Sequence, residues 1–513
     1  MEVMHGKLEI ALADRLSRRW WLSVLGSVAL ILSFLCWGMA GWYRETYGDV
    51  GFDGVLYTLT SALDGVDTNL VRSCLRFLAK RLPWLLLGVA VLFGNGKRRL
   101  LLHRRDRTIR LYPLSGRTAA VLTAAISLLL VGNAAKAVGL DRYVMDIANP
   151  SALFEEEYRY SDDGVVTFPE EKRNLIYIFL ESMETTFFSQ EQGGALQENV
   201  IPELYQLALE NVNFSHNDGV GGFTAVPGAT WTIGGMVGQT AGIPLKTPPG
   251  VSVNGYGQDG DFLPGASSLM KILRDAGYRQ AVLFGSDGYF GGRTPYYVAH
   301  GCYEVYDLRS ARASGIIPAD YHNAFWGMED LYLYEYAREL LADLSSQETP
   351  FALTLLTVDT HHVGGYVCEL CGEDHEEQYE NVYRCASRQL ADFLQWLQQQ
   401  DYYEDTTIVI AGDHLSMDGG YMRRNVEDPE VRRVYNCFVN AAVTPENTRN
   451  RQMCTYDMFP TTLAAMGCSI AGERLGLGTN LFSDTPTLME QMGAETFTSE
   501  VARYSRYYAD NFY

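Results

Sequence analysis

The stretch from Trp20 to Tyr43 contains no charged residue over 24 positions, and this feature most restricts how the chain can fold. A helix of that length rises about 36 Å, which is enough to cross a hydrocarbon core of about 30 Å. Trp20, Trp42 and Tyr43 lie at its ends, where aromatic residues suit a membrane interface. A signal peptide would be shorter and would end in small residues at a cleavage site. We therefore expect a transmembrane helix that is retained.

Two further apolar segments follow, at about 76–95 and 118–138. The apolar part of the first of them is short, and it becomes a span only if it extends backwards with basic residues near the interface. We predict a membrane domain of about three transmembrane helices over residues 1–139. A polar connector over 140–172 would join it to a large domain over 173–513.

The balance of charged residues changes from basic to acidic at the end of the predicted membrane domain, near residue 139. Residues 1–139 contain 18 Lys and Arg against 9 Asp and Glu, whereas residues 140–513 contain 23 against 53. Basic residues precede the first span and fill the loop before the third, so both stretches should stay in the cytoplasm. Three crossings then make this a multi-pass cell-membrane protein with the large domain outside the cell. Two crossings would place that domain inside the cell. An acidic domain repels polyanions, so we expect no nucleic-acid partner.

From residue 173 onwards, apolar strand-like runs alternate with helix-like stretches. This alternation favours an α/β fold, with a mostly parallel sheet and helices on both faces. The strand-like runs cover 175–180, 281–285, 351–357, 407–411 and 433–442, and the helix-like stretches cover 267–277, 328–345, 377–399 and 456–466.

Three of the buried runs end in side chains that bind metals or transfer protons. Glu181 follows one run, Asp413 and His414 follow another, and His361 and His362 follow a third. Ligands bind at the carboxyl ends of parallel strands, so these groups are expected to meet there. A carboxylate with an imidazole suits a divalent metal. The alternatives to a metal site are that the acidic residues cap the helices that follow and that a histidine only forms hydrogen bonds within its loop.

A nucleophile and a phosphate-binding cation complete the candidate site. The segment PGATWTIGGMVGQT (227–240) indicates a glycine-containing turn that enters a helix, with Thr230 and Thr232 near its start. A hydroxyl there is favoured in its deprotonated form by the helix dipole, although threonine is also a common N-cap. Arg293 lies in a glycine-rich loop and could clamp a phosphate, or form a surface ion pair instead.

Seven of the nine cysteines lie in the large domain. Cys368 and Cys371 form a CELC turn, which suits a tight disulfide, half of a zinc site or two free thiols. No second CxxC motif follows to complete a zinc ribbon. We therefore expect a disulfide bond rather than zinc at this turn.

Several motifs in this order resemble the phosphoglycerol transferases of the alkaline phosphatase and sulfatase superfamily, which include lipoteichoic acid synthases and, closest to this chain, glucan phosphoglycerol transferases. The resemblance spans about residues 173–470. It rests on LESMETTFF, GATWTIGGMVGQTAGIPL, FGSDGYFGGR, TVDTHH, AGDHLSMDGG and TYDMFPTTLAAMG.

The resemblance implies a metal site and a substrate site. Its metal ligands would be Glu181, Asp413, His414 and the nucleophilic threonine, and its substrate contacts would be Arg293 and His361. Some relatives carry a threonine three positions before the helix hydroxyl, but that spacing from Thr232 gives Ala229 here. Thr230 is then the first candidate for the nucleophile and Thr232 the second.

By the same resemblance, a membrane-anchored enzyme would move phosphoglycerol from phosphatidylglycerol to a glycan or teichoic-acid-type acceptor. The reaction would pass through a phospho-threonine intermediate. The implied cofactor is a divalent metal, Mn²⁺ first, with Mg²⁺ or Zn²⁺ as alternatives. Other readings are a phosphoethanolamine transferase, a sulfatase, or an inactive membrane-tethered binding protein. The C/S-x-P-S-R signature of sulfatases is absent near 226–236.

Overall fold

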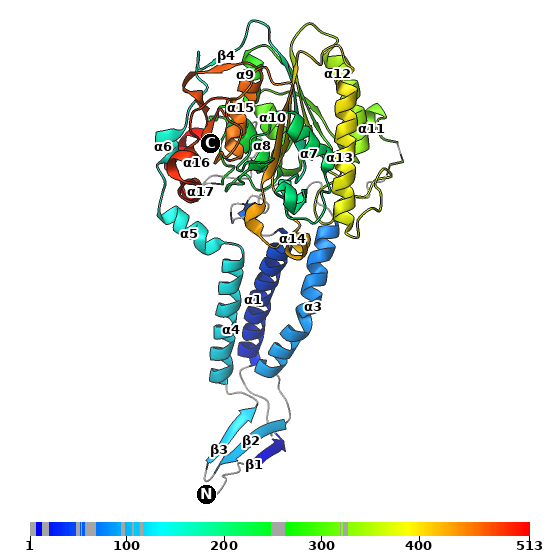
Figure 1. The fold of residues 1–513 in the computed structure, drawn as a ribbon. Coiled ribbons are helices and arrows are strands. Elements are labelled where there is room, and N and C mark those ends of the chain that lie inside the picture. The colour runs from blue at the N-terminus through cyan, green and yellow to red at the C-terminus, as the bar shows by residue number, and fades with distance from the viewer. Residues whose placement is uncertain are drawn as a thin grey trace. The chain divides into compact units, whose positions relative to one another are not determined.

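The computed structural model separates into two compact units, residues 1–45 with 67–141, and residues 46–66 with 142–513 (Figure 1). The structure describes residues 7–12, 20–47, 52, 54–56, 68–93, 98–104, 107–112, 116–247, 262–318, 320–321 and 327–513.

The first unit contains three long helices, α1 (Trp20–Tyr47), α3 (Thr68–Phe93) and α4 (Gly116–Ala137). Helices α1 and α3 pack antiparallel, because Gly26 of α1 approaches Phe93 whereas Gly38 approaches Leu78. Glycine at these positions leaves room for the side chains of Phe93 and Leu78, as small residues do in many membrane helix pairs. Strands β1 (Lys7–Leu12), β2 (Arg98–Arg104) and β3 (Arg107–Tyr112) form a three-stranded antiparallel sheet.

Two of these helices are long and apolar enough to cross a membrane, over Val24–Tyr47 in α1 and Arg117–Ala137 in α4. They match the first and third predicted spans. Helix α3 covers most of the predicted second span, but several basic residues, among them Arg76 and Lys80, lie within it. The number of crossings therefore stays a prediction.

The second unit is built around a seven-stranded sheet in the order β6-β11-β10-β5-β9-β7-β8. The five strands from β10 to β8 run parallel, whereas β11 is antiparallel to β10 and β6 is antiparallel to β11. The α/β class predicted from the sequence is confirmed. The strands are β5 (Asn174–Leu180), β6 (Gly222–Phe223), β7 (Arg279–Phe284), β8 (Glu304–Tyr306), β9 (Phe351–Leu356), β10 (Thr406–Gly412) and β11 (Val434–Val439).

Helices cover both faces of this sheet. Alternate side chains of its central strands point to opposite sides, so each face has apolar side chains that a layer of helices buries. In β5, Tyr177 and Phe179 enter one hydrophobic core, and Ile176 and Ile178 enter the other. The first core is covered by α6 (Leu153–Glu157), α8 (Thr232–Ala241), α9 (Leu269–Asp275), α10 (Arg293–Ala299), α15 (Met458–Ala465), α16 (Leu488–Met492), α17 (Ala494–Ala502) and α18 (Arg506–Phe512). The second is covered by α7 (Pro202–Glu210), α11 (Leu308–Ser314), α12 (Asp330–Leu344), α13 (Gln378–Leu397) and α14 (Gly419–Asn425).

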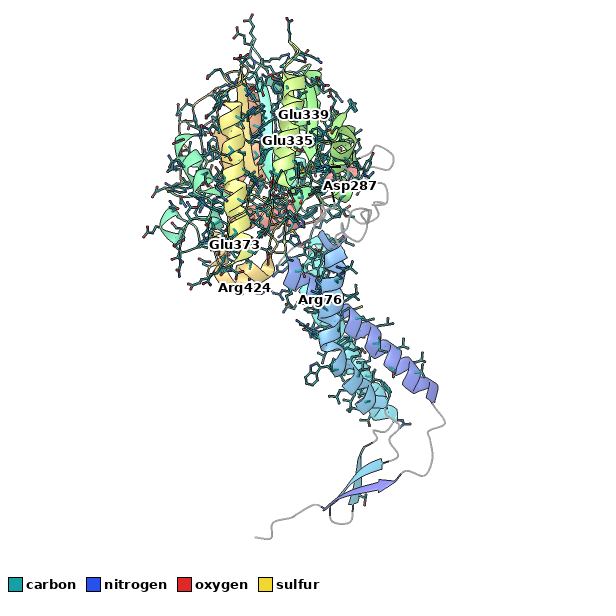
Figure 2. All side chains as sticks on the ribbon, turned by 90° about the vertical axis from the view of Figure 1, so that its right-hand side faces the viewer. Arg76, Asp287, Glu335, Glu339, Glu373 and Arg424 are labelled. Atoms are coloured by element: carbon teal, nitrogen blue, oxygen red, sulfur yellow. The ribbon has the colours of Figure 1, made fainter. Side chains whose placement is uncertain are left out.

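Helix α12 illustrates how the sequence pattern sets the layers. Leu333 and Leu340 are buried against the sheet, and Glu335 and Glu339 are exposed one helical turn apart (Figure 2). The predicted connector contains α5 (Leu140–Ala148), α6 and β4 (Val166–Thr167), and β4 pairs with β12 (Ser469–Ile470) near the C-terminal part of the chain. A short antiparallel pair, β13 (Arg474–Leu475) and β14 (Gly478–Thr479), lies close by in the sequence.

Candidate active site

The candidate site lies where the central parallel strands end. Glu181 follows β5, and Asp413 follows β10, whose last residue Gly412 is in register with Leu180. The two carboxylates therefore leave adjacent strands at the same level of the sheet. Strand β9 lies on the other side of β5 and leads towards His361. The sheet order thus brings together the three strand ends that the sequence singled out.

Glu181, Asp413 and His414 form one buried group. Each side chain exposes at most 1% of its surface, and their ligand atoms all lie within 4.8 Å of one another. The Nε2 atom of His414 is 3.5 Å from a carboxylate oxygen of Glu181 and 3.4 Å from Oδ2 of Asp413. Two carboxylates and an imidazole at this spacing form a ligand set for a divalent metal.

Thr232, the first residue of α8, joins this group. Its hydroxyl is 3.3 Å from Oε2 of Glu181 and 3.4 Å from Nε2 of His414. Thr230 lies in the turn before the helix, and no hydrogen bond within the described part of the chain joins it to the three ligands. The geometry therefore favours Thr232 over Thr230 as the nucleophile, and the choice between them stays a prediction.

The residues present fit a metal cation. Oδ2 of Asp413 is buried and has no hydrogen-bond partner among the described residues, although its neighbour Oδ1 has two. Burial raises the pKa of Glu181, and the charge of Asp413 raises it further. Burial alone would lower the pKa of His414, but the two carboxylates outweigh it and the pKa is raised. A cation would relieve the repulsion between the carboxylates and satisfy the buried oxygen.

Ser182 holds both carboxylates, a role that the sequence did not reveal. Its backbone N–H donates to Oδ1 of Asp413 at 2.7 Å, and its hydroxyl donates to Oε1 of Glu181 at 2.8 Å. Ser182 has a φ of 56°, in the left-handed region that non-glycine residues rarely adopt. Such conformations persist where the surroundings impose them, often at functional sites.

The backbone of the next residues orients His414. Its Nδ1 donates to the carbonyl of Leu415 at 2.7 Å, which leaves Nε2 as the atom that faces the carboxylates. The backbone N–H of His414 donates to Oδ1 of Asp413 at 2.8 Å. Both side chains are thus fixed in the orientation that a metal site requires.

Helix α8 is held directly against the strand end that carries Asp413. Gln239 donates to the carbonyls of Gly412 at 2.7 Å and Asp413 at 3.3 Å. Gly235 faces the same backbone, and a Cβ atom at this position would lie 2.0 Å from the carbonyl oxygen of Asp413. The close approach that sets the position of Thr232 therefore depends on a glycine.

Arg293 and His361 are the predicted substrate contacts. Arg293 is buried and donates to the carbonyls of Phe290 at 2.9 Å and Asp287 at 2.7 Å, which fixes its guanidinium group. Burial lowers the pKa of His361, Glu181 raises it, and the positive charge of Arg293 lowers it. His361 is therefore within electrostatic reach of both the metal-ligand group and Arg293.

His361 and His362 differ in their surroundings. Nδ1 of His361 donates to the carbonyl of His362 at 2.7 Å. The two ring nitrogens of His362 are buried and have no hydrogen-bond partner within the described ranges. Burial lowers the pKa of His362 well below its usual value, so the ring is neutral.

A buried ion pair supports the loop after Asp413. Glu184, from the segment after β5, accepts two hydrogen bonds from Arg432, at 2.6 and 2.8 Å. It also accepts one from the backbone N–H of Ser416 at 2.9 Å, and Arg432 donates to the carbonyl of Ser416. This pair ties the segment that carries Glu181 to the segment that carries His414.

Comparison with known proteins agrees with this geometry. The protein family described as Sulfatase matches residues 173–468, which is more than half of the chain and contains every residue of the site.

Among curated proteins, the chain is 29% identical over 501 residues to phosphoglycerol transferase I of Xanthomonas campestris pv. campestris, covering 95% of this chain and 65% of that protein. It is 27% identical over 382 residues to phosphoglycerol transferase I of Escherichia coli, covering 72% of this chain and 45% of that protein. The chain therefore spans about half to two thirds of the length of these relatives.

Two solved structures align with much of the chain. Lipooligosaccharide phosphoethanolamine transferase A from Neisseria meningitidis aligns with a TM-score of 0.49 and 14% identity, over 87% of this chain and 84% of that one. The lipoteichoic acid synthase from Listeria monocytogenes aligns with a TM-score of 0.48 and 19% identity, over 64% and 80%.

Proposed function

Because this chain belongs to the sulfatase family, we propose that it is a membrane-anchored, metal-dependent phosphoglycerol transferase. It takes phosphoglycerol from phosphatidylglycerol and transfers it to a hydroxyl of a glycan or a teichoic-acid-type polymer. The relatives named phosphoglycerol transferase I support phosphoglycerol as the group that is transferred.

One observation carries this proposal. The hydroxyl of Thr232 lies against Glu181 and His414, in a group that also contains Oδ2 of Asp413, which accepts no hydrogen bond from the described residues. A hydroxyl nucleophile beside a buried metal-ligand set can carry out a group transfer in which the enzyme forms a covalent phosphoester intermediate. Thr232 is also at the start of α8, where the helix dipole favours negative charge on its oxygen.

A divalent metal held by Glu181, Asp413, His414 and Thr232 would lower the pKa of the threonine hydroxyl and stabilise negative charge on the phosphoryl oxygens. Mn²⁺ is our first choice for this metal, with Mg²⁺ and Zn²⁺ as alternatives. The chain's own residues supply the nucleophile, the proton and the second positive charge.

In the first step, Oγ1 of Thr232 attacks the phosphorus of phosphatidylglycerol, and its proton passes to His361, which burial keeps neutral by lowering its pKa. The bond between phosphorus and the diacylglycerol oxygen breaks, and His361 gives a proton to that leaving oxygen. Arg293 stabilises the charge that develops on the phosphoryl oxygens. The products are diacylglycerol and a phosphoglyceryl ester of Thr232.

In the second step, an acceptor hydroxyl attacks the same phosphorus. His361, neutral again, takes the proton of that hydroxyl and gives it to Oγ1 of Thr232 as the bond between phosphorus and Thr232 breaks. The free hydroxyl of Thr232 is restored, so the enzyme returns to its starting state. One phosphoglycerol group has moved and no oxidant or reductant is consumed.

The apolar helices support a location of the enzyme at the membrane that contains its proposed donor. Helices α1 and α4 have the length and composition of membrane spans, and the proposed donor is itself a membrane lipid. The distribution of basic residues supports a multi-pass arrangement with the catalytic unit outside the cell. The acceptor would then be a component of the cell envelope.

The test is release of diacylglycerol from fluorescent phosphatidylglycerol by the purified full-length protein with Mn²⁺. We expect wild type and Thr230→Ala to release it, and Thr232→Ala and Asp413→Ala to lose release. Thr230→Ala is the matched control, because it removes the same side chain two residues away. Release that survives in Thr232→Ala, or cleavage of phosphatidylethanolamine in place of phosphatidylglycerol, would overturn the proposal.

A further inference from the structure

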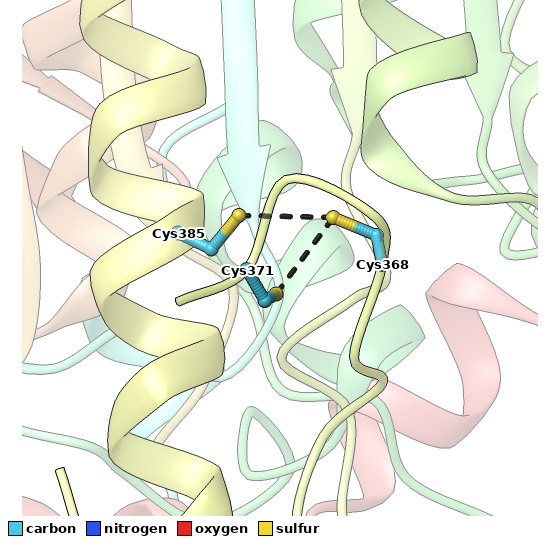
Figure 3. Close-up of side chains that lie close together, drawn as sticks. All are labelled: Cys368, Cys371 and Cys385. Atoms are coloured by element: carbon cyan, nitrogen blue, oxygen red, sulfur yellow. Dashed lines mark hydrogen bonds between the residues drawn. The ribbon is translucent and has the colours of Figure 1, made fainter. Parts of the chain in front are cut away.

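A second group of potential metal ligands lies in the loop between β9 and α13. Cys368 and Cys371 belong to this loop, and Cys385 is on α13. Figure 3 shows the three side chains close together, with dashed lines from the sulfur of Cys368 to the sulfurs of Cys371 and Cys385. We propose that they form a structural zinc site, bound as three thiolates.

The spacing of the sulfur atoms is that of a metal–thiolate site. Sγ of Cys368 is 3.7 Å from Sγ of Cys371 and 3.7 Å from Sγ of Cys385. Tetrahedral zinc with bonds of about 2.3 Å to sulfur separates its sulfur ligands by about 3.8 Å. All three sulfur atoms lie within 4.8 Å of one another, so one ion can reach each of them.

The disulfide predicted between Cys368 and Cys371 is not present, because all nine cysteines are free thiols. From the sequence, we expected only a second CxxC motif to complete a zinc site. Cys385 lies 14 residues beyond Cys371 and reaches the turn through the fold of the chain, so no local motif reveals it. A disulfide would engage two of the sulfurs and leave the third without a partner, whereas one metal engages all three.

Neighbouring groups are placed to stabilise thiolates. The side-chain amide of Gln389, one turn after Cys385 on α13, donates to the sulfur of Cys385 at 3.3 Å and of Cys368 at 3.8 Å. Arg388 donates to the carbonyl of Leu370, between the two loop cysteines, at 3.3 Å. Hydrogen bonds and positive charge around sulfur ligands are typical of metal–thiolate sites.

The loop that the site would hold also contains the proposed proton donor. His361 and His362 lie at its start, and α13 begins at Gln378. Tyr379 already fixes one end, since its hydroxyl donates to the carbonyl of Thr360 at 2.9 Å. A zinc ion would fix the middle of the loop to α13. The three thiols each lose a proton on binding, so the affinity rises with pH.

The test uses cobalt as a spectroscopic probe on the purified full-length protein. Cobalt is added to the reduced, chelator-treated wild type, and its absorption is recorded. Thiolate ligands give an intense sulfur-to-cobalt charge-transfer band, which oxygen and imidazole ligands do not. We expect this band in the wild type, and also in Asp413→Asn, in which the other metal site is impaired.

Variants and metal analysis locate the site. We expect Cys385→Ala to lose the band and one equivalent of zinc, and the matched control Cys437→Ala, a buried cysteine of β11, to keep both. A wild type without the band would overturn the proposal, and this result does not depend on whether a variant folds. A disulfide between any two of these cysteines in the protein as isolated would also overturn it.

Discussion

Substitution of Gly235 by alanine should separate the nucleophile from the metal ligands. The new Cβ would lie 2.0 Å from the carbonyl oxygen of Asp413 and 2.8 Å from its carbonyl carbon. Both are backbone atoms at the end of a central strand, so they cannot turn away as a side chain would. Helix α8 must therefore move by about 1 Å to restore ordinary contact distances.

The expected loss of activity follows from that displacement. Thr232 is three residues before Gly235 on the same helix, and its hydroxyl is 3.3 Å from Glu181. A displacement of about 1 Å in a catalytic group can cost about 100-fold in rate. The fold should survive, because overpacking costs about 1–3 kcal/mol whereas replacement of a helical glycine by alanine regains about 1 kcal/mol.

The assay is diacylglycerol release at saturating phosphatidylglycerol, with the thermal unfolding midpoint measured on the same samples. Gly132→Ala is the matched control, because Gly132 lies inside α4 and, apart from the neighbouring backbone of that helix, no atom of the described residues lies within 4 Å of the position its Cβ would take. We expect kcat to fall about 100-fold in Gly235→Ala and to stay unchanged in Gly132→Ala. A folded Gly235→Ala protein with kcat within about threefold of wild type would refute the reasoning.

Three further outcomes follow from the structure. Removal of divalent metal by a chelator should abolish turnover, and it should lower the unfolding temperature of wild type by more than that of Asp413→Ala, because only wild type then keeps two buried carboxylates that repel one another without a cation. Glu184→Ala should lower the free energy of unfolding by about 3–5 kcal/mol in a denaturant titration, since it leaves Arg432 largely buried without its carboxylate; a loss below about 1 kcal/mol would contradict this. Burial lowers the pKa of His300 to about 3 in the folded protein. In the unfolded chain this histidine has its ordinary pKa of about 6.5, so below that pH the unfolded chain binds a proton that the folded protein does not. Stability should therefore fall as the pH drops below about 6.5, by about 2 kcal/mol at pH 5, and His300→Gln should remove that part of the loss, as thermal unfolding at several pH values would show.

Much of the fold could be predicted because hydrophobic patterns report burial. The predicted helix over 328–345 is α12 (Asp330–Leu344), and the predicted helix over 377–399 is α13 (Gln378–Leu397). The run 433–442 was recognised as a strand and is β11, but its antiparallel direction was not. An apolar run does not show in which direction the strand runs within the sheet, because that direction depends on the path of the connections between strands.

The candidate site was predictable as far as it rests on strand ends. Glu181, Asp413 and His414 meet because parallel neighbouring strands end at one edge, a general property of such sheets. The choice between Thr230 and Thr232 was not predictable, because it depends on the residue at which α8 begins. Helix boundaries are the least certain part of a sequence pattern. Ser182 was missed because nothing in the sequence signals a left-handed serine.

The most direct test of the account is to find the covalent intermediate. The protein would be mixed with phosphatidylglycerol and Mn²⁺ without acceptor, quenched in acid after a short time, digested, and analysed by mass spectrometry. The account predicts one phosphoglycerol group on Thr232, absent from Asp413→Ala. A phosphoglycerol group on Thr230 or on any other residue, or turnover without any modified residue, would contradict it.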